Sequence, residues 1–410
     1  MFKIKVILKS IAKRSKFLRK IMRFVFFTFG KFRYELISRN IEVDEKRILF
    51  ACFQGKSYSD SPKALYEYIL KNGEYKDYRL VWGFENPQKY SFLENNPNTR
   101  VVKIKSEEYL KELAKAKYWF INFKTDDHIF PKKNQVLLQC WHGTPLKRLG
   151  CDLLHFDNAM NTAKELSRRY EIETQKYSFF ISPSRFASEK FVSAWNMKAL
   201  GKENIILETG YPRNDFLYSF TEEDALRLKN NLGLPLDKKV ILYAPTYRDN
   251  QHSVSEGYTY RLNVDFDFLE RELKEDYVIL FRAHYFVADS FNFEKYKGFV
   301  YDLSSYDDIS ELYVISDMLI TDYSSVFFDY ANLKRPIIFY MYDLESYRDE
   351  MRGFYLDLSE LPSSPVQTEE ELAERIKNAY VDEKYLEFRN RFCYLEDGKA
   401  CERVIKAVLD

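Results

Sequence analysis

The sequence predicts an α/β protein made of two doubly wound parallel-sheet domains that face each other across a cleft. Near-continuous apolar segments of strand length alternate with amphipathic helical segments, which is typical of parallel sheets covered on both faces. This alternation breaks at residues 210–215 and then starts again. With 410 residues, of which 46% are apolar and 17% aromatic, the chain is long enough to bury two cores.

In the first half, predicted strands alternate with predicted helices. The strands are expected at residues 47–53, 78–84, 99–104, 118–123, 136–141, 177–183 and 204–209. Helices are expected at residues 61–72, 106–116 and 158–176, and from residue 185 onward. Pro62 supports the first of these helices, because proline is favoured in the first turn of a helix.

The second half repeats the pattern after a polar helix that ends near Gly233. Its strands are expected at residues 239–247, 277–281, 299–303, 318–321 and 336–342. We place the domain boundary near residue 218, which gives a first domain at 35–217 and a second at 218–410. In doubly wound folds, ligands bind at the carboxyl ends of the strands, so those ends are expected to line the cleft.

The segment before the first domain is strongly basic. Residues 1–34 hold 11 Lys or Arg and no acidic residue, although the formal net charge of the whole chain is only +1. Apolar residues recur there at helical spacing, which predicts a basic amphipathic helix lying on an anionic membrane surface. Its longest apolar run, residues 21–29, is short and contains Arg23, so we expect no transmembrane helix.

The basic segment lacks the features of a signal peptide. No small-residue cleavage site follows the apolar run, which argues against a signal peptide. Two alternatives to membrane binding remain open: a helix packed on the protein's own body, and a nucleic-acid arm. We expect no nucleic-acid partner.

The cysteines indicate a reduced compartment. There are five, at positions 52, 140, 151, 393 and 401, and none forms a C-x-x-C pair. An odd number of cysteines in mostly apolar surroundings favours free thiols in an intracellular setting.

The most informative stretch is QCWHGTPLK, residues 139–147, in which a strand ends at a histidine. Gly143 permits a sharp turn, and Thr144 followed by Pro145 predicts a helix that begins at once. His142 would then lie beside the positive end of a helix dipole, a position that suits an anionic ligand. The alternative is a hydrogen-bonded core histidine without a role in binding.

Polar motifs follow three predicted strands of the second half. They are APTYR at 244–248, RAH at 282–284 and TDYSS at 321–325, the last followed by a helix that carries Asp329. Ser324 and Ser325 are expected to cap that helix and to meet phosphate oxygens, while Arg248, Arg282 and His284 supply charge or donors. The pattern predicts a pyrophosphate site without a Gly-rich loop, since neither a Walker motif nor G-x-G-x-x-G is present. The alternative is an ordinary set of helix caps and surface ion pairs.

Together these stretches resemble a known family. HGTPLK at 142–147, GYPRND at 210–215, APTYR, RAH and TDYSSVFFDY at 321–330 are similar, in this order, to the CDP-glycerol:glycerophosphate glycerophosphotransferases of teichoic acid and capsule synthesis. The resemblance implies a GT-B fold in which residues 35–217 form the acceptor-side domain and residues 218–410 bind the CDP-linked donor. It also implies a peripheral position on the cytoplasmic face of the membrane.

The resemblance assigns roles to individual residues. His142 and His284 are the implied catalytic residues. The implied substrate-binding residues are Gly143, Thr144, Pro145, Leu146, Arg213, Pro245, Thr246, Arg248, Arg282, Ala283, Ser324, Ser325 and Asp329. Tyr285 and Tyr247 depart from the proline and tryptophan that are commoner at their positions in the family.

The expected reaction transfers glycerol phosphate from CDP-glycerol to a hydroxyl of a lipid-linked acceptor and releases CMP. A neutral His142 can take the proton of the attacking hydroxyl, and the donors of the second domain can stabilise the leaving charge. No metal-binding motif such as H-E-x-x-H is visible, so no cofactor is implied, although Asp322 keeps a divalent cation open.

Three alternatives to this function remain open: a CDP-ribitol donor, a nucleotide-sugar donor on the same fold, and a catalytically idle scaffold. The acceptor, the choice between primase and polymerase, and the oligomeric state are not determined by the sequence.

Overall fold

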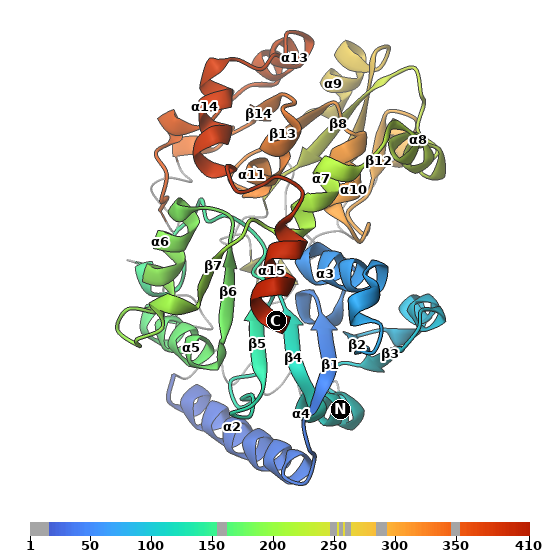
Figure 1. Cartoon of the computed structure of the whole chain (residues 1–410). Helices are drawn as coiled ribbons and strands as arrows, with labels where there is room; N and C mark the ends of the chain where they lie inside the picture. Colours follow the sequence, from blue (N-terminus) through green and yellow to red (C-terminus); the bar gives the residue numbers. More distant parts are fainter. Residues whose placement is uncertain are drawn as a thin grey trace.

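The computed structural model describes residues 16–153, 162–246, 252–253, 257–258, 264–283, 293–345 and 353–410. The first domain is built on a seven-stranded parallel sheet in the order β3-β2-β1-β4-β5-β6-β7 (Figure 1). Its strands are β1 (Asp44–Ala51), β2 (Arg79–Phe84), β3 (Thr99–Lys103), β4 (Ala116–Ile121), β5 (Val136–Gln139), β6 (Phe179–Ser182) and β7 (Ile206–Glu208). All seven predicted strands of this half are therefore confirmed.

The second domain contains a five-stranded parallel sheet in the order β12-β11-β8-β13-β14. Its strands are β8 (Lys239–Ala244), β11 (Tyr277–Phe281), β12 (Val300–Asp302), β13 (Met318–Thr321) and β14 (Ile337–Phe339). A short antiparallel pair, β9 (His252–Ser253) and β10 (Gly257–Tyr258), was not predicted. Two parallel-sheet domains in this arrangement confirm the predicted GT-B-like fold class.

Helices cover both sheets. They are α2 (Lys16–Ser38), α3 (Asp60–Lys71), α4 (Glu107–Lys115), α5 (Ala163–Lys176), α6 (Arg185–Ala194), α7 (Phe216–Ser219), α8 (Glu222–Asn231), α9 (Phe266–Leu273), α10 (Ile309–Ile315), α11 (Val326–Tyr330), α13 (Glu369–Lys377), α14 (Glu383–Phe392) and α15 (Ala400–Leu409). In Figure 1 the arrowheads of β4 and β5 point toward the second domain. Residues that follow these strands are thus carried to the junction of the two domains.

The last helix lies outside the domain in which the sequence places it. The sequence places all of residues 218–410 in the second domain, but α15 packs against α3. Its buried residues Cys401, Val404 and Ile405 share a core cluster with Ile48 and Phe50 of β1. The end of the chain therefore returns to the first domain, because the apolar face of α15 packs against α3 and β1.

Helix α2 packs on the first domain with one face and leaves the other face open. Tyr34 is buried in the core of that domain, and Arg19 and Arg23 pair with Glu165 of α5 at 3.3 and 3.2 Å. Figure 1 shows α2 at the end of the sheet that is farthest from the second domain. Among the described residues, no helix is long and apolar enough to cross a membrane. Residues 1–15 of the predicted basic segment lie outside the described residues.

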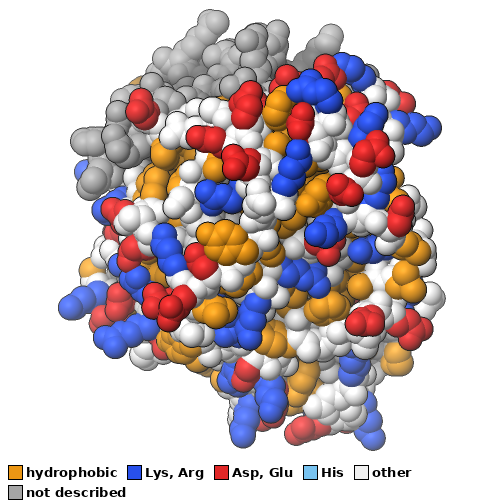
Figure 2. All heavy atoms as spheres, turned by 90° about the horizontal axis from the view of Figure 1, so that it is seen from above, with side chains coloured by type: hydrophobic (Ala, Val, Ile, Leu, Met, Phe, Trp, Pro, Cys, Tyr) orange, Lys and Arg blue, Asp and Glu red, His pale blue; other side chains and the backbone are white. Residues whose placement is uncertain are grey.

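Charges do not gather on the outer end of the second domain. Figure 2 looks down on this end, where Lys and Arg side chains alternate with Asp and Glu over the part that the structure describes. Basic and acidic side chains are therefore interspersed on the described part of this face.

Candidate active site

His142 lies in a loop directly after β5, at the junction of the two domains. The predicted helix after Gly143 is absent: residues 143–149 form no helix, and Lys147 instead makes an antiparallel bridge with Phe354 of the second domain. Tertiary pairing thus overrides the local Thr144-Pro145 signal, and no helix dipole begins beside His142. The expectation of such a dipole was wrong.

The imidazole of His142 is held in one tautomer. Its Nδ1 atom lies 2.7 Å from the backbone oxygen of Asn122, which can only accept a hydrogen bond, so Nδ1 carries the proton. In the neutral ring Nε2 is then the unprotonated nitrogen. Surrounding protein desolvates the ring and lowers the pKa of His142 below its ordinary value, although the residue stays exposed on one side. A neutral imidazole with an unprotonated Nε2 can act as a general base.

The backbone around His142 is strained. Trp141 has a φ of 42°, and Phe53 and Gln54, which follow β1, have φ values of 44° and 60°. The rings of Trp141 and Phe53 lie 4.1 and 5.7 Å from the His142 ring, measured between centroids. Positive φ is costly for such residues and is concentrated at functional sites in proteins. The strain therefore supports the functional interpretation of His142 over that of an ordinary core histidine.

The loop after His142 connects the two domains. A Cβ atom on Gly143 would overlap Ser325 Oγ of the second domain, so any larger residue here would displace the Ser325 hydroxyl. Leu146 is buried in the core of the second domain, its backbone oxygen accepts Tyr355 N at 2.8 Å, and Arg148 N donates to Gly353 O at 3.0 Å. Thr144 and Pro145 are buried between these contacts. Gly143 thus contacts Ser325 of the second domain, a contact that the sequence did not predict, and Leu146 packs in the core of that domain.

The strand ends of the second domain lie close together. Thr321 Oγ1 donates to Ala244 O at 2.8 Å, and Asp322 Oδ1 accepts Thr246 N at 2.8 Å and Tyr323 N at 2.6 Å. Asp322 is buried, and its carboxylate connects the loop after β8 to the loop after β13. Pro245 is buried beside Thr246.

Among the described residues, no group of three His, Cys, Asp or Glu side chains is arranged to hold a metal ion.

The remaining predicted donor residues are placed as follows. Arg282 is half-buried, and its Nη1 donates to Leu303 O at 3.1 Å and to Tyr306 O. Ala283 N donates to Ser304 Oγ at 3.1 Å.

Ser324 and Ser325 are half-buried and lie just before α11. Contrary to expectation, Ser325 makes no side-chain capping hydrogen bond. Arg248 and His284 lie outside the described residues.

Arg213 and Asp329 contact each other in a buried cluster between the domains. The Nε and Nη2 atoms of Arg213 donate to the two carboxylate oxygens of Asp329 at 3.1 and 3.0 Å. Asp60 of α3 lies 3.4 Å from Nη1 of the same guanidinium, and Asn214 donates to Asp329 at 3.2 Å. Glu396 accepts from Asn214 at 3.1 Å, and burial raises the pKa of Glu396 to about 8. In this structure Arg213 therefore joins α3 to α11.

Several residues of the site were not predicted from the sequence. Asn122 fixes the tautomer of His142, and its Oδ1 also accepts Phe53 N at 2.8 Å. Gln139 is fully buried just before the histidine loop, and Asp60 binds Arg213. A polar glutamine inside the apolar run at residues 136–141 was a visible signal. Asn122 and Asp60 had no such signal, because their partners come from distant parts of the chain.

Two parallel-sheet domains, joined where the loop after His142 contacts the end of a strand of the second sheet, are the arrangement of GT-B-like enzymes. A family model described as CDP-glycerol:poly(glycerophosphate) glycerophosphotransferase matches residues 32–410. The chain belongs to this family.

Individual relatives agree with this assignment. The chain is 39% identical to a teichoic acid poly(glycerol phosphate) polymerase of Bacillus spizizenii, over 98% of this chain and 99% of that protein. It is 38% identical to a teichoic acid glycerol-phosphate transferase of Staphylococcus aureus, over 95% and 98% of the two chains. A solved structure of the wall teichoic acid polymerase TagF, a variant soaked with CDPG, matches with a TM-score of 0.83 and 39% identity over 97% of each chain.

Proposed function

We propose that this chain transfers glycerol phosphate from CDP-glycerol to a hydroxyl of a lipid-linked teichoic acid acceptor. The observation that carries the proposal is the hydrogen bond from His142 Nδ1 to Asn122 O, which leaves Nε2 as the base. Nε2 takes the proton of the acceptor hydroxyl while its oxygen bonds to the β-phosphorus of the donor. The bond from that phosphorus to the CMP oxygen breaks, and CMP leaves.

We place the donor on the second domain, next to His142. The contact between Gly143 and Ser325 brings the histidine loop to the end of β13, where half-buried Ser324 and Ser325 can donate to phosphate oxygens. Arg213 and Asp329 support this region by holding α11 against α3. In the proposal, Arg248, Arg282 and His284 complete the donor site as the family resemblance implies.

The experiment that tests this function is direct. Purified protein is incubated with radiolabelled CDP-glycerol or CDP-ribitol and a lipid-linked acceptor, and the release of CMP is measured. CMP release from CDP-glycerol but not from CDP-ribitol supports the proposal. A preference for CDP-ribitol would show that CDP-ribitol is the donor. No release from either donor, nor from nucleotide sugars, favours a scaffold. The length of the polymer product separates a primase from a polymerase. The length of the protein does not, because the Bacillus spizizenii relative, which matches over 99% of its length, is named a polymerase.

The double variant Ser324→Ala/Ser325→Ala should raise the KM for CDP-glycerol by at least tenfold. Hydrogen bonds to charged phosphate oxygens contribute about 1.5–3 kcal/mol each, and both hydroxyls face the proposed pyrophosphate position. The measurement is steady-state kinetics together with calorimetric donor binding. Ser219→Ala, which removes an exposed hydroxyl of α7, is the control and should leave KM unchanged. Unaltered donor binding in the double variant would move the site elsewhere.

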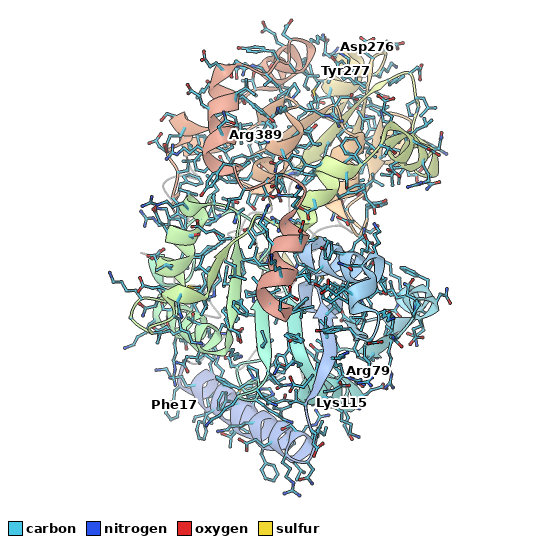
Figure 3. The ribbon with its side chains drawn as sticks, in the orientation of Figure 1. Phe17, Arg79, Lys115, Asp276, Tyr277 and Arg389 are labelled. Atoms are coloured by element: carbon cyan, nitrogen blue, oxygen red, sulfur yellow. The ribbon has the colours of Figure 1, made fainter. Side chains whose placement is uncertain are left out.

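We further propose that α2 holds the enzyme on the cytoplasmic face of an anionic membrane. Phe17, Phe24 and Phe29 expose 72%, 70% and 67% of their surfaces, on the side of the helix opposite the buried Arg19 and Tyr34. Exposed Lys20, Lys31 and Arg33 flank this apolar side. Figure 3 labels Phe17 at the end of the first domain that is remote from the second. Apolar side chains flanked by basic ones suit an anionic lipid surface.

Replacing these three phenylalanines by serine should abolish binding to anionic vesicles. Deleting residues 1–34 would remove Tyr34 from the core and break the ion pairs to Glu165, so point variants test the surface without unfolding the domain. Flotation with vesicles of varied anionic lipid content is the measurement. Serine at exposed Phe92 and Tyr380, which lie on other elements, is the control and should not reduce binding. If the triple variant floats as well as the wild type, α2 belongs only to the fold.

A further inference from the structure

We propose that Gln139 is a positioning residue for His142, because its single amide holds both backbone segments on which the imidazole depends. The proposal rests on the proposed role of His142 as the base. Gln139 is the last residue of β5, and none of its surface is exposed. It therefore acts through its neighbours and not on substrate.

The two ends of the Gln139 amide bind two different segments. Oε1 accepts the backbone N–H of Trp141 at 2.9 Å, and Nε2 donates to the backbone oxygen of Phe123 at 3.1 Å. The orientation of the amide is fixed by chemistry, since an N–H group can only donate and a carbonyl oxygen can only accept. One side chain thus connects the end of β5 to the loop after β4.

Both segments determine where the imidazole lies. Trp141 immediately precedes His142 and has a φ of 42°, which is unfavourable for a tryptophan without support. Phe123 immediately follows Asn122, whose backbone oxygen binds His142 Nδ1 at 2.7 Å. By holding Trp141 N and Phe123 O at one amide, Gln139 sets the separation between His142 and its hydrogen-bond acceptor. Only a side chain with a donor and an acceptor at this length can hold both.

A buried network behind Gln139 stiffens this arrangement. Nε2 of Gln139 also donates to the Tyr177 hydroxyl at 3.2 Å, and that hydroxyl donates to Glu173 at 3.3 Å. Glu173 pairs with the fully buried Lys176 at 2.6 Å. Lys176 in turn donates to Thr125 Oγ1 at 2.9 Å, so the network returns to the loop that carries Asn122. The loop is therefore held at both Phe123 and Thr125.

The experiment compares Gln139→Met with Gln135→Met. Gln135 is a second buried glutamine on the same segment, four positions earlier, and its Nε2 donates to Leu113 O at 2.8 Å and Ala116 O at 2.6 Å, away from His142. Both variants lose buried hydrogen bonds, so both should lower the melting temperature. Only Gln139→Met should lower kcat, by about tenfold or more, with the KM for CDP-glycerol within twofold, because a small displacement of a catalytic group slows chemistry without weakening donor binding.

A second readout does not depend on turnover. Nitrogen-15 NMR of labelled histidine should show His142 as the Nδ1–H tautomer in wild type and in Gln135→Met, and a mixture of tautomers in Gln139→Met. Tyr177→Phe, which keeps the ring, is a milder variant should Gln139→Met not fold, and it should lower kcat in the same direction. A wild-type protein without turnover would refute the proposed function, whereas the tautomer would still report on Gln139. Unchanged kcat and tautomer in Gln139→Met would overturn the positioning role.

Discussion

His142→Ala is expected to lower kcat by about 10²–10⁴-fold while the affinity for CDP-glycerol stays within a few fold. The reason is that a base acts on the acceptor proton and contributes little to donor binding. Calorimetry with CDP-glycerol and single-turnover kinetics with a short soluble acceptor measure the two quantities separately. His128→Ala is the control, because this second imidazole packs against Phe27 of α2, far from the domain junction. A variant that keeps more than about a tenth of the wild-type kcat would contradict the base role.

The same assignment makes a prediction about pH. Desolvation lowers the pKa of His142 below its ordinary 6.5, so the neutral ring persists to lower pH than in a solvated histidine. In wild type, kcat/KM should therefore fall only when the pH drops below 6.5, because that is where the base becomes protonated. An acid limb above pH 7 would assign the essential base to another group.

Arg213→Met is expected to lower the free energy of unfolding by about 3–5 kcal/mol. The guanidinium is nearly buried and binds Asp329 and Asp60, so its removal leaves two buried carboxylates without their cation. Because these two residues belong to different domains, the loss should also weaken the contact between α3 and α11. Urea unfolding followed by circular dichroism measures the change.

Two further variants test this explanation. Arg185→Met removes an exposed ion pair with Glu189 at 3.3 Å and should change the free energy of unfolding by less than about 1 kcal/mol. Combining Arg213→Met with Asp329→Asn should recover part of the loss, because one of the uncompensated charges is then absent. Equal losses for Arg213→Met and Arg185→Met would show that the buried cluster contributes no more than a surface pair.

Much of the architecture could be predicted from the sequence because hydrophobic periodicity is local. The strands at 277–281 and 318–321 were predicted to the residue, and the others agree within a few positions at each end. The helix predicted after Gly143 was wrong for a physical reason. A local N-cap and proline signal is weak compared with the pairing of residues 146–148 with residues 353–355 of the other domain.

The candidate site was predictable only in part. Motifs at strand ends predicted that His142 and Ser325 lie at the edges of their sheets, since parallel strands carry their following residues to one edge; their roles stay predictions. The sequence did not indicate that Arg213 binds Asp329, 116 positions away, or that Asn122, 20 positions before His142, fixes its tautomer. Such pairs depend on how loops from separate strands approach each other, and no local propensity encodes that approach.

The sequence by itself therefore determined the two parallel sheets, the family, and the basic apolar helix, because each of these follows from residue order over short distances. The tertiary structure decided the rest: the return of α15 to the first domain, the contact of Gly143 with Ser325, and the hydrogen bonds of Gln139 with Trp141 and of Asn122 with His142. These features are matches between surfaces and hydrogen-bonding groups that are far apart in the chain. They form only when burial of the two cores brings those groups within reach, and there they must be paired, since an unpaired buried polar group is costly.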